Sequence, residues 1–395
     1  MVFNLRTFSL SSPSIEVGST ARFRELLRRF SVYELRVATG NFSPNSMLGE
    51  GAFGPVYRGC LADGSIVAIK RMRELSEHSL KQFWTEVEVA GIAPHPNLLS
   101  LVGFCDTEQE RLLVYPFMVN KSLNFHLGRR VIHPIDWSIR MRIALGVARG
   151  LAHLHDQCHP SIIHRDVSCS NTLLNEEFEP VLGDLGLTRI MHETDIVVGN
   201  VEWSMDCRPV KWSIDRRPVE WSPRHRRCIS PQRYHDTYVN SAVRAHTGYV
   251  APEYLTTGKC TWRVDVYAYG YILLELITGK QLSDNGIGGL HPVDLMSELV
   301  EDNSLETIID SKLQGSYSKD EAECVLQLAL LCVCMNPAKR PKMSDVVSTL
   351  ENSCHDKRIP GEVDSQLDFD WNLCETKCST PYYSILPSPS SSETA

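Results

Sequence analysis

The 395-residue chain lacks the long apolar runs that membrane-spanning proteins need. A helix that crosses a bilayer requires about 20 mostly apolar residues, and the best stretch here, residues 269–278, is interrupted by Glu275. We do not expect a secretory signal either, because Arg6 lies within the only apolar patch of the first residues. Position 2 is Val2, whereas N-myristoylation needs a glycine. We therefore expect the chain to be cytoplasmic as encoded.

Excess basic charge and regular cysteine spacing are also missing. The 40 Lys and Arg residues against 48 Asp and Glu give a formal net charge of -8, so nucleic acid is not an expected partner. The 13 cysteines show no repeated metal-ligand spacing. With 43% hydrophobic and 22% charged residues, the composition excludes global disorder. A chain of this length predicts two lobes or two domains with substantial cores.

The pattern of apolar residues changes along the chain. Residues 42–117 alternate apolar and polar positions between turn residues, with one helical stretch, which predicts a β-rich N-terminal lobe. Helical periodicity dominates residues 118–352 and is clearest over 137–156, 261–279 and 321–335. We therefore predict an α+β fold of two lobes, a small β-rich one with one key helix and a larger, mostly helical one, with a cleft between them.

The two ends differ in composition from these lobes. Residues 1–41 are predicted to be a leader that is partly disordered, and its basic part leaves peripheral contact with a membrane surface open. Residues 353–395 are rich in Ser and Pro and are predicted to be a disordered tail.

A short repeat interrupts the larger lobe. A nine-residue unit recurs over residues 201–227, and each copy carries one tryptophan at the same place: Trp203, Trp212 and Trp221. Units of this size cannot form a self-standing solenoid, so we predict an exposed insertion over residues 199–235. Two interpretations stay open: a disordered or wrongly translated loop, and a docking segment in which Trp and Arg side chains bind a partner.

A glycine pattern in the small lobe indicates phosphate binding. Gly49, Gly51 and Gly54 form G-x-G-x-x-G, which lets a backbone approach phosphates closely in several kinds of nucleotide site. A dinucleotide-binding fold would begin a helix at the third glycine, whereas here Val56 continues as a strand. The pattern therefore predicts a loop over the phosphates of ATP.

A lysine and a glutamate extend this predicted ATP site. Lys70 ends the strand that contains Ala68, where its side chain can reach the α- and β-phosphates. Glu86, 16 residues further on in a predicted helix, is the expected ion-pair partner that aims the lysine. We also assign Tyr115 and Met118, at the end of the small lobe, to the ATP site.

The sequence HRDVSCSN, from His164 to Asn171, carries the residues for phosphate transfer. Asp166 is the predicted catalytic base that orients a substrate hydroxyl, and Asn171 is a predicted magnesium ligand. Asp184 is the second predicted magnesium ligand; Leu185 follows it where a phenylalanine is usual and conserves an apolar packing role.

In order and spacing, these motifs resemble the protein kinase family. FSVYELRVATGNFS, RLLVYPFM and RGLAHLHDQCHPSIIHRDVS are similar to plant receptor-like kinases, most of all to the somatic-embryogenesis-receptor-kinase group of leucine-rich-repeat receptors, over residues 31–352. The resemblance implies a bilobal fold, ATP and Mg²⁺ as cofactors, and serine/threonine specificity. It also implies a buried ion pair between Glu253 and Arg340, and that Asp265 anchors the backbone of the catalytic loop.

The resemblance also implies partners and a location. Protein substrates and partner receptor kinases are expected, in signalling at the inner face of the plasma membrane. The ectodomain and membrane helix of such receptors have no counterpart in this sequence. Contact with the membrane is therefore expected through partners.

Two residues depart from the family pattern, and the insertion is a third departure. Ser168 stands where such kinases carry a lysine, and His246 stands where a threonine usually bonds the catalytic aspartate. Arg165 marks a kinase whose activation segment is ordered by phosphorylation, and Thr237 and Ser241 match phosphoacceptor positions. Two functions stay open: a serine/threonine kinase of reduced activity, and a pseudokinase that binds ATP and regulates partner receptor kinases.

Overall fold

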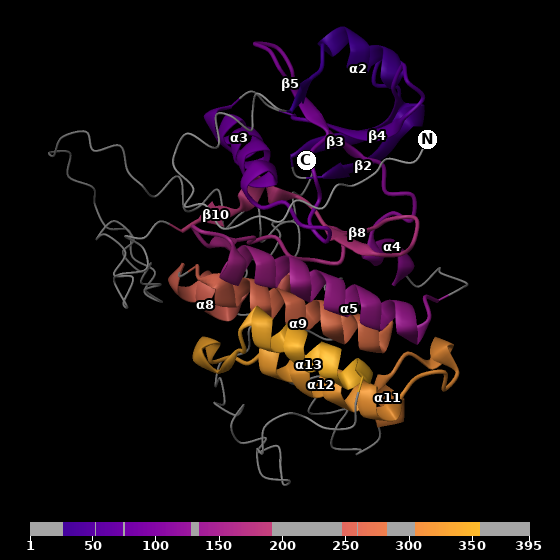
Figure 1. Cartoon of the computed structure of the whole chain (residues 1–395), viewed down its shortest axis with the longest axis vertical. Coiled ribbons are helices and arrows are strands. Elements are labelled where there is room, and N and C mark those ends of the chain that lie inside the picture. Colours follow the sequence, from indigo (N-terminus) through magenta and orange to yellow (C-terminus); the bar gives the residue numbers. More distant parts are fainter. Residues whose placement is uncertain are drawn as a thin grey trace, which may run out of the picture.

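The chain folds into two lobes, one rich in strands and one rich in helices (Figure 1). The computed structural model describes residues 27–51, 53–73, 76–127, 134–191, 247–258, 260–282 and 305–355. The predicted α+β, bilobal fold is confirmed. The predicted insertion at 199–235, the residues Thr237, Ser241 and His246, and the tail beyond residue 355 lie outside the described residues.

A six-stranded sheet forms the small lobe, in the order β1-β5-β6-β4-β3-β2. Its strands are β1 (Arg28–Arg29), β2 (Met47–Gly51), β3 (Gly54–Cys60), β4 (Ile66–Arg71), β5 (Gly103–Asp106) and β6 (Arg111–Pro116). The pairings are antiparallel except for β1, which pairs with β5 in parallel. In β4, Val67 and Ile69 are buried on one face. Because side chains alternate along a strand, Ala68 and Lys70 lie on the other face, toward the site described below.

Each face of this sheet is covered by one helix. The α2 helix (Val32–Ala38) packs Leu35 into a cluster that also holds Phe30 and Ile69. The α3 helix (Glu77–Ile92) begins at Ser76, whose side chain accepts a hydrogen bond from the Ser79 amide. Residues 28–38, which the sequence assigned to the leader, thus contribute β1, α2 and two core side chains to the small lobe.

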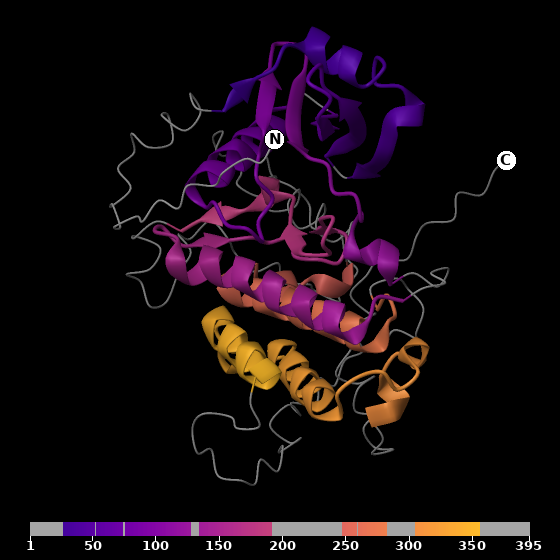
Figure 2. The ribbon, with the colours of Figure 1, turned by 45° about the vertical axis from the view of Figure 1, so that its right-hand side comes forward.

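Helices build the large lobe, with two short two-stranded sheets on the side nearer the six-stranded sheet. The helices are α4 (Leu123–His126), α5 (Trp137–Ala152), α8 (Pro252–Thr257), α9 (Trp262–Thr278), α11 (Leu305–Ile308), α12 (Lys319–Cys332) and α13 (Met343–His355). One sheet pairs β7 (Ile162–Ile163) with β10 (Arg189–Ile190), and the other pairs β8 (Thr172–Leu174) with β9 (Pro180–Leu182). Figure 2 shows α5, α9 and the pair α12 and α13 stacked below the sheet.

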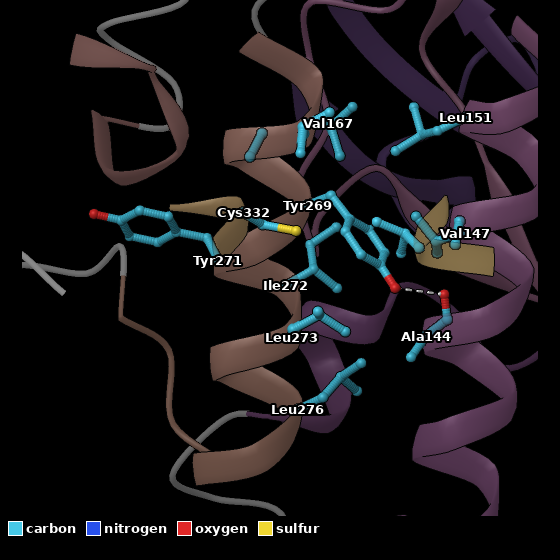
Figure 3. Close-up of a cluster of buried hydrophobic side chains, with 14 of the residues drawn as sticks. Ala144, Val147, Leu151, Val167, Tyr269, Tyr271, Ile272, Leu273, Leu276 and Cys332 are labelled. Atoms are coloured by element: carbon cyan, nitrogen blue, oxygen red, sulfur yellow. Dashed lines mark hydrogen bonds between the residues drawn. The ribbon is translucent and has the colours of Figure 1, made fainter. Parts of the chain in front are cut away.

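The α9 helix is the centre of the large-lobe core (Figure 3). It is buried from Val264 to Thr278, which fits its apolar sequence on all sides. On one side the Tyr269 hydroxyl donates to the Ala144 carbonyl of α5 over 3.0 Å. On the other side Gly270 lets α12 approach closely, because a Cβ there would lie 2.7 Å from the Cβ of Cys332. No helix in the described parts of the chain is both long and apolar enough to cross a membrane.

The ion pair expected between Glu253 and Arg340 is present. It is bidentate: Arg340 Nη1 lies 2.6 Å from Glu253 Oε1, and Nη2 lies 2.9 Å from Oε2. The guanidinium also donates to the carbonyls of Arg263 and Cys334 over 3.0 and 2.9 Å. The arginine is 3% exposed. It therefore ties the start of α8 to the start of α9 and to the segment after α12, in surroundings where an unpaired charge would be costly.

Candidate active site

The face of the small-lobe sheet on the α3 side brings four predicted ATP residues together. Val56 pairs with Lys70, and Ala68 pairs with Tyr115, on the adjacent strands β3, β4 and β6. Tyr115 packs in the cluster on the α3 side of the sheet, with Ala68 and Met118 at its border. Strand alternation and these pairings put the four strand residues on one face.

The glycine loop lies between β2 and β3, at the edge of this face. Gly54 has a φ of 137°, and a Cβ there would lie 2.1 Å from the Arg71 carbonyl oxygen, so no other residue fits. A Cβ at Gly49 would meet nothing within 4 Å. Glycine is therefore required at Gly54 by the fold itself, whereas Gly49 leaves open space over the backbone.

The predicted contact between Lys70 and Glu86 is present, and Asp184 joins it. Lys70 Nζ lies 3.1 Å from Glu86 Oε2 on α3 and 2.8 Å from Asp184 Oδ1 of the large lobe. Lys70 is 8% exposed and Glu86 3%. Three ionised groups from a strand, a helix and a loop thus meet between the two lobes.

The charge balance of this cluster decides the protonation of its members. Burial by itself lowers the pKa of Lys70, but the charges of Asp184 and then Glu86 outweigh it and hold that pKa above its ordinary value. Burial raises the pKa of Glu86, while Lys70 and the Tyr115 hydroxyl oppose that rise. Two carboxylates share one ammonium, so the site carries excess negative charge. An added cation would relieve this excess, which suits a magnesium site.

The hydroxyl of Tyr115 forms a hydrogen bond within this cluster, a role that was not predicted from the sequence. It donates to Glu86 Oε1, while Lys70 donates to Oε2. Both carboxylate oxygens of a buried glutamate are thereby satisfied. The aromatic residue at the end of β6 thus supports the ion pair in addition to lining the predicted ATP site.

Replacing Tyr115 with Phe is expected to lower the free energy of unfolding by about 1 to 3 kcal/mol, the range for a buried acceptor that loses its donor. Chemical denaturation measures the change. The control is Tyr33→Phe on α2, where the side chain is 78% exposed, and a change within about 0.5 kcal/mol is expected. Equal effects of the two substitutions would show that the Tyr115 hydroxyl does not support Glu86.

Asp265 anchors the backbone of the catalytic loop through hydrogen bonds, as predicted. Asp265 accepts from the backbone amides of His164 and Arg165, both over 2.7 Å, and from His155 Nε2 over 2.8 Å. It is 1% exposed and belongs to α9, the most buried helix of the lobe. The loop is thereby fixed to the core, which limits its freedom to move.

Asp166 and Asn171 lie next to each other on this loop. Asn171 Nδ2 donates to the Asp166 carbonyl over 2.8 Å and to the Asp166 carboxylate over 2.9 Å. Asp184 follows β9 and has a left-handed backbone with a φ of 61°, and Leu185 after it is buried in the large-lobe core. The left-handed turn and the buried leucine fix Asp184 where it reaches Lys70.

Ser168 is turned inward and is fully buried. Its hydroxyl accepts from the Asn171 amide over 3.3 Å, and its carbonyl accepts from the Thr172 hydroxyl over 2.9 Å. The side chain therefore supports the turn that carries Asn171. Ser168 therefore adds no polar group to the site, and the effect of the substitution there is the loss of the usual lysine.

A small cavity lies beside the catalytic loop. Asp166 and Arg165 line it from the loop, and Tyr249, Ala251 and Tyr254 line it from the segment before and within α8. Tyr249 donates to Glu275, and its hydroxyl accepts from the Cys169 amide over 3.3 Å. The segment just before α8 is thus joined to the loop that carries Asp166.

The donors present suit Mg²⁺ held together with phosphates. In the parts of the chain that the structure describes, no three His, Cys, Asp or Glu side chains gather as a metal site. Magnesium bound to a nucleotide commonly uses only one or two carboxylates, and phosphate oxygens and water supply the rest. Asp184 and Asn171, both predicted as ligands, offer the oxygen atoms for such a site.

Comparison with known proteins agrees with this geometry. The sequence model of the family described as protein tyrosine and serine/threonine kinase matches residues 42–214 and 227–350. The break between these ranges falls within the segment predicted as an insertion. An LRR receptor kinase, SERK2 of Oryza sativa subsp. japonica, is 40% identical over 334 residues, which cover 82% of this chain and 48% of that protein. The chain thus spans about half the length of this curated relative.

Proposed function

The chain belongs to the protein tyrosine and serine/threonine kinase family, and on that premise we propose that it transfers the γ-phosphoryl group of ATP to serine and threonine hydroxyls of proteins. The observation that carries the proposal is the double contact of Lys70, with Glu86 at 3.1 Å and with Asp184 at 2.8 Å. This contact joins the phosphate-binding lysine, the helix that aims it and the metal ligand in one cluster. Protein kinases need both the pair of lysine and glutamate and the metal-binding aspartate in place for phosphoryl transfer.

Each residue of the site has a distinct part in this proposal. The backbone around Gly49, Gly51 and Gly54 covers the phosphates, and Lys70 binds their oxygens. Asp184 and Asn171 would hold Mg²⁺, which neutralises charge on the β- and γ-phosphate oxygens. Val56, Ala68, Tyr115 and Met118 would border the remainder of the nucleotide.

Asp166 is the proposed catalytic base. Its carboxylate is oriented by Asn171 Nδ2 at 2.9 Å, and its backbone is anchored through the neighbouring Arg165 amide on Asp265. In this position it orients the acceptor hydroxyl and takes its proton as the phosphate moves. The cavity lined by Asp166, Tyr249 and Ala251 is the proposed entrance of that hydroxyl.

Partners and location follow from the same similarity. We infer protein substrates and partner receptor kinases, with access to the inner face of the plasma membrane through those partners or through peripheral contact. Thr237 and Ser241 are the proposed phosphoacceptors of the activation segment. Both lie outside the described residues.

A pseudokinase is the second candidate function, and one observation favours it. Ser168 is fully buried, and its hydroxyl accepts from the Asn171 amide, so the lysine that steadies the moving phosphate in similar kinases has no replacement at that position. The identity with a receptor kinase supports the enzyme instead. An enzyme with a low turnover is consistent with both the missing lysine and the identity with a receptor kinase.

Transfer of label from [γ-³²P]ATP to a generic protein acceptor tests the proposal. With Mg²⁺ the wild-type chain is expected to place label on serine and threonine, as seen by phosphoamino acid analysis. Thermal stabilisation by Mg-ATP without any incorporated label would favour the pseudokinase. Absence of both would exclude nucleotide binding and so both candidate functions.

Ser168→Lys is expected to raise the rate of transfer by about 10-fold to 100-fold. A preorganised cationic donor is worth roughly a hundredfold to a thousandfold, and loss of the Ser168 hydroxyl from the turn at Asn171 offsets part of this gain. Ser168→Ala is the matched control, because it removes the same hydroxyl without adding charge, and no gain is expected. Steady-state rates at saturating Mg-ATP measure both, and a gain in neither would place the limitation elsewhere.

A further inference from the structure

Residues 27–30, here called the N-terminal strap, lie along the edge of the small-lobe sheet. The two residues of β1 pair in parallel with β5, Arg28 opposite Gly103 and Arg29 opposite Phe104. The Phe30 amide continues the ladder by donating to the Phe104 carbonyl over 2.9 Å. The strap is thus the outermost strand of the sheet, beyond β5 (Figure 2).

Alternation along the strap sends its side chains to both faces of the sheet. Phe30 is buried in the cluster beneath α2. Leu27 packs against the cluster beneath α3, and the Arg29 guanidinium lies 5.4 Å from the ring centroid of Phe104 in that same cluster. The strap therefore contacts the core on the α3 side as well as the core on the α2 side.

The contact on the α3 side reaches the helix that carries Glu86. The Phe104 ring lies 5.7 Å from the Trp84 ring and 6.0 Å from the Phe83 ring, both of α3. Phe83 is fully buried, and Glu86 follows it by three residues and is 3% exposed. Residues three apart share one face of a helix, so a shift of Phe83 shifts Glu86 with it.

The fit between strap and sheet is tight at Gly103. A Cβ at this position would lie 2.1 Å from the Arg28 carbonyl oxygen and 2.7 Å from the Phe30 ring. Either distance is too short for contact, so alanine at Gly103 must displace the strap. A substitution at Gly103 can therefore displace the strap without changing any residue of the strap itself.

From these contacts we propose that the N-terminal strap is a positioning element of the ATP site. Through Leu27, Arg29 and Phe104 it fixes α3 on the sheet and so keeps Glu86 on Lys70. The proposal rests on the proposed function in that Lys70 binds the phosphates of ATP.

Leu27→Lys and Gly103→Ala in the full chain test the proposal. Each is expected to weaken binding of Mg and a non-hydrolysable ATP analogue by about fivefold, within the range for substitutions along a coupled set of contacts. Faster hydrogen exchange of the α3 amides is expected alongside. Val37→Lys is the matched control: it adds the same charge to the same N-terminal segment, at a side chain 64% exposed on α2, and should change neither quantity.

Wild-type affinity and wild-type exchange of α3 in a folded Leu27→Lys protein would overturn the proposal. If Gly103→Ala fails to fold, Leu27→Lys alone tests the proposal. Leu27 is only partly buried, at the border of the cluster on the α3 side, so this variant is expected to fold. Binding of the analogue does not require phosphate transfer. A chain that binds the analogue and transfers nothing would therefore contradict the proposed function and still test the strap.

Discussion

Replacing Asp166 with Asn is expected to lower the rate of phosphate transfer by roughly a thousandfold, in the middle of the range for loss of a general base. The amide is nearly the same size, and its oxygen can still accept from Asn171 Nδ2, which lies 2.9 Å from the carboxylate in the native site. What is lost is the ability to take a proton. The Kd for Mg-ATP should stay within about twofold, because the substitution removes an interaction made only during the reaction.

Asp156→Asn is the matched control for this prediction. Asp156 is exposed at the end of the helical stretch that follows α5, and the same change of charge there should leave the rate unaltered. Steady-state kinetics and a calorimetric titration measure the two quantities. A tenfold rise in the Kd of the Asp166 variant, with little loss of rate, would mean that Asp166 binds nucleotide and does not act as the base.

Arg340→Met is expected to destabilise the fold by about 3 to 5 kcal/mol, the usual result of breaking a buried ion pair from one side. Arg340 is 3% exposed, and its guanidinium makes two contacts with Glu253 as well as two with backbone carbonyls. Methionine fills similar space but donates nothing, so the Glu253 carboxylate loses its partner. Urea denaturation measures the loss.

The control for Arg340 is Arg149→Met. Arg149 forms an ion pair of 2.7 Å with Glu351, but the two side chains are 49% and 43% exposed. Exposed pairs contribute about 0 to 1 kcal/mol, so a small effect is expected. If both substitutions cost the same, the buried pair would not have the structural role assigned to it.

Local patterns in the sequence were sufficient for much of the fold. The α9 helix spans Trp262–Thr278, close to the predicted 261–279, because its apolar run is long and ends at Gly279 with a φ of 64°. The pairing of Lys70 with Glu86 was also predictable, because the sequence places this glutamate on a helix shortly after the strand of the lysine. The catalytic roles of Asp166, Asn171 and Asp184 stay predictions, supported by where their side chains lie.

Features that depend on contacts between distant residues could not be predicted from the sequence. A strand of two residues has no periodicity to recognise, and the partner of β1 is β5, far along the chain. The Tyr115 hydroxyl meets Glu86 only after a strand and a helix have packed together. Similarly, a missing lysine is visible at Ser168 in the sequence, but the inward direction of the serine is not.

The most direct test of the central claim is a single-turnover measurement with Mg and [γ-³²P]ATP already bound. Wild type and Asp166→Asn are each mixed with the same acceptor in separate reactions. The label on serine and threonine is followed until it reaches its plateau. We predict that wild type transfers its label roughly a thousand times faster. Equal rates from the two proteins, with nucleotide bound in both, would contradict the claim that this site transfers phosphate.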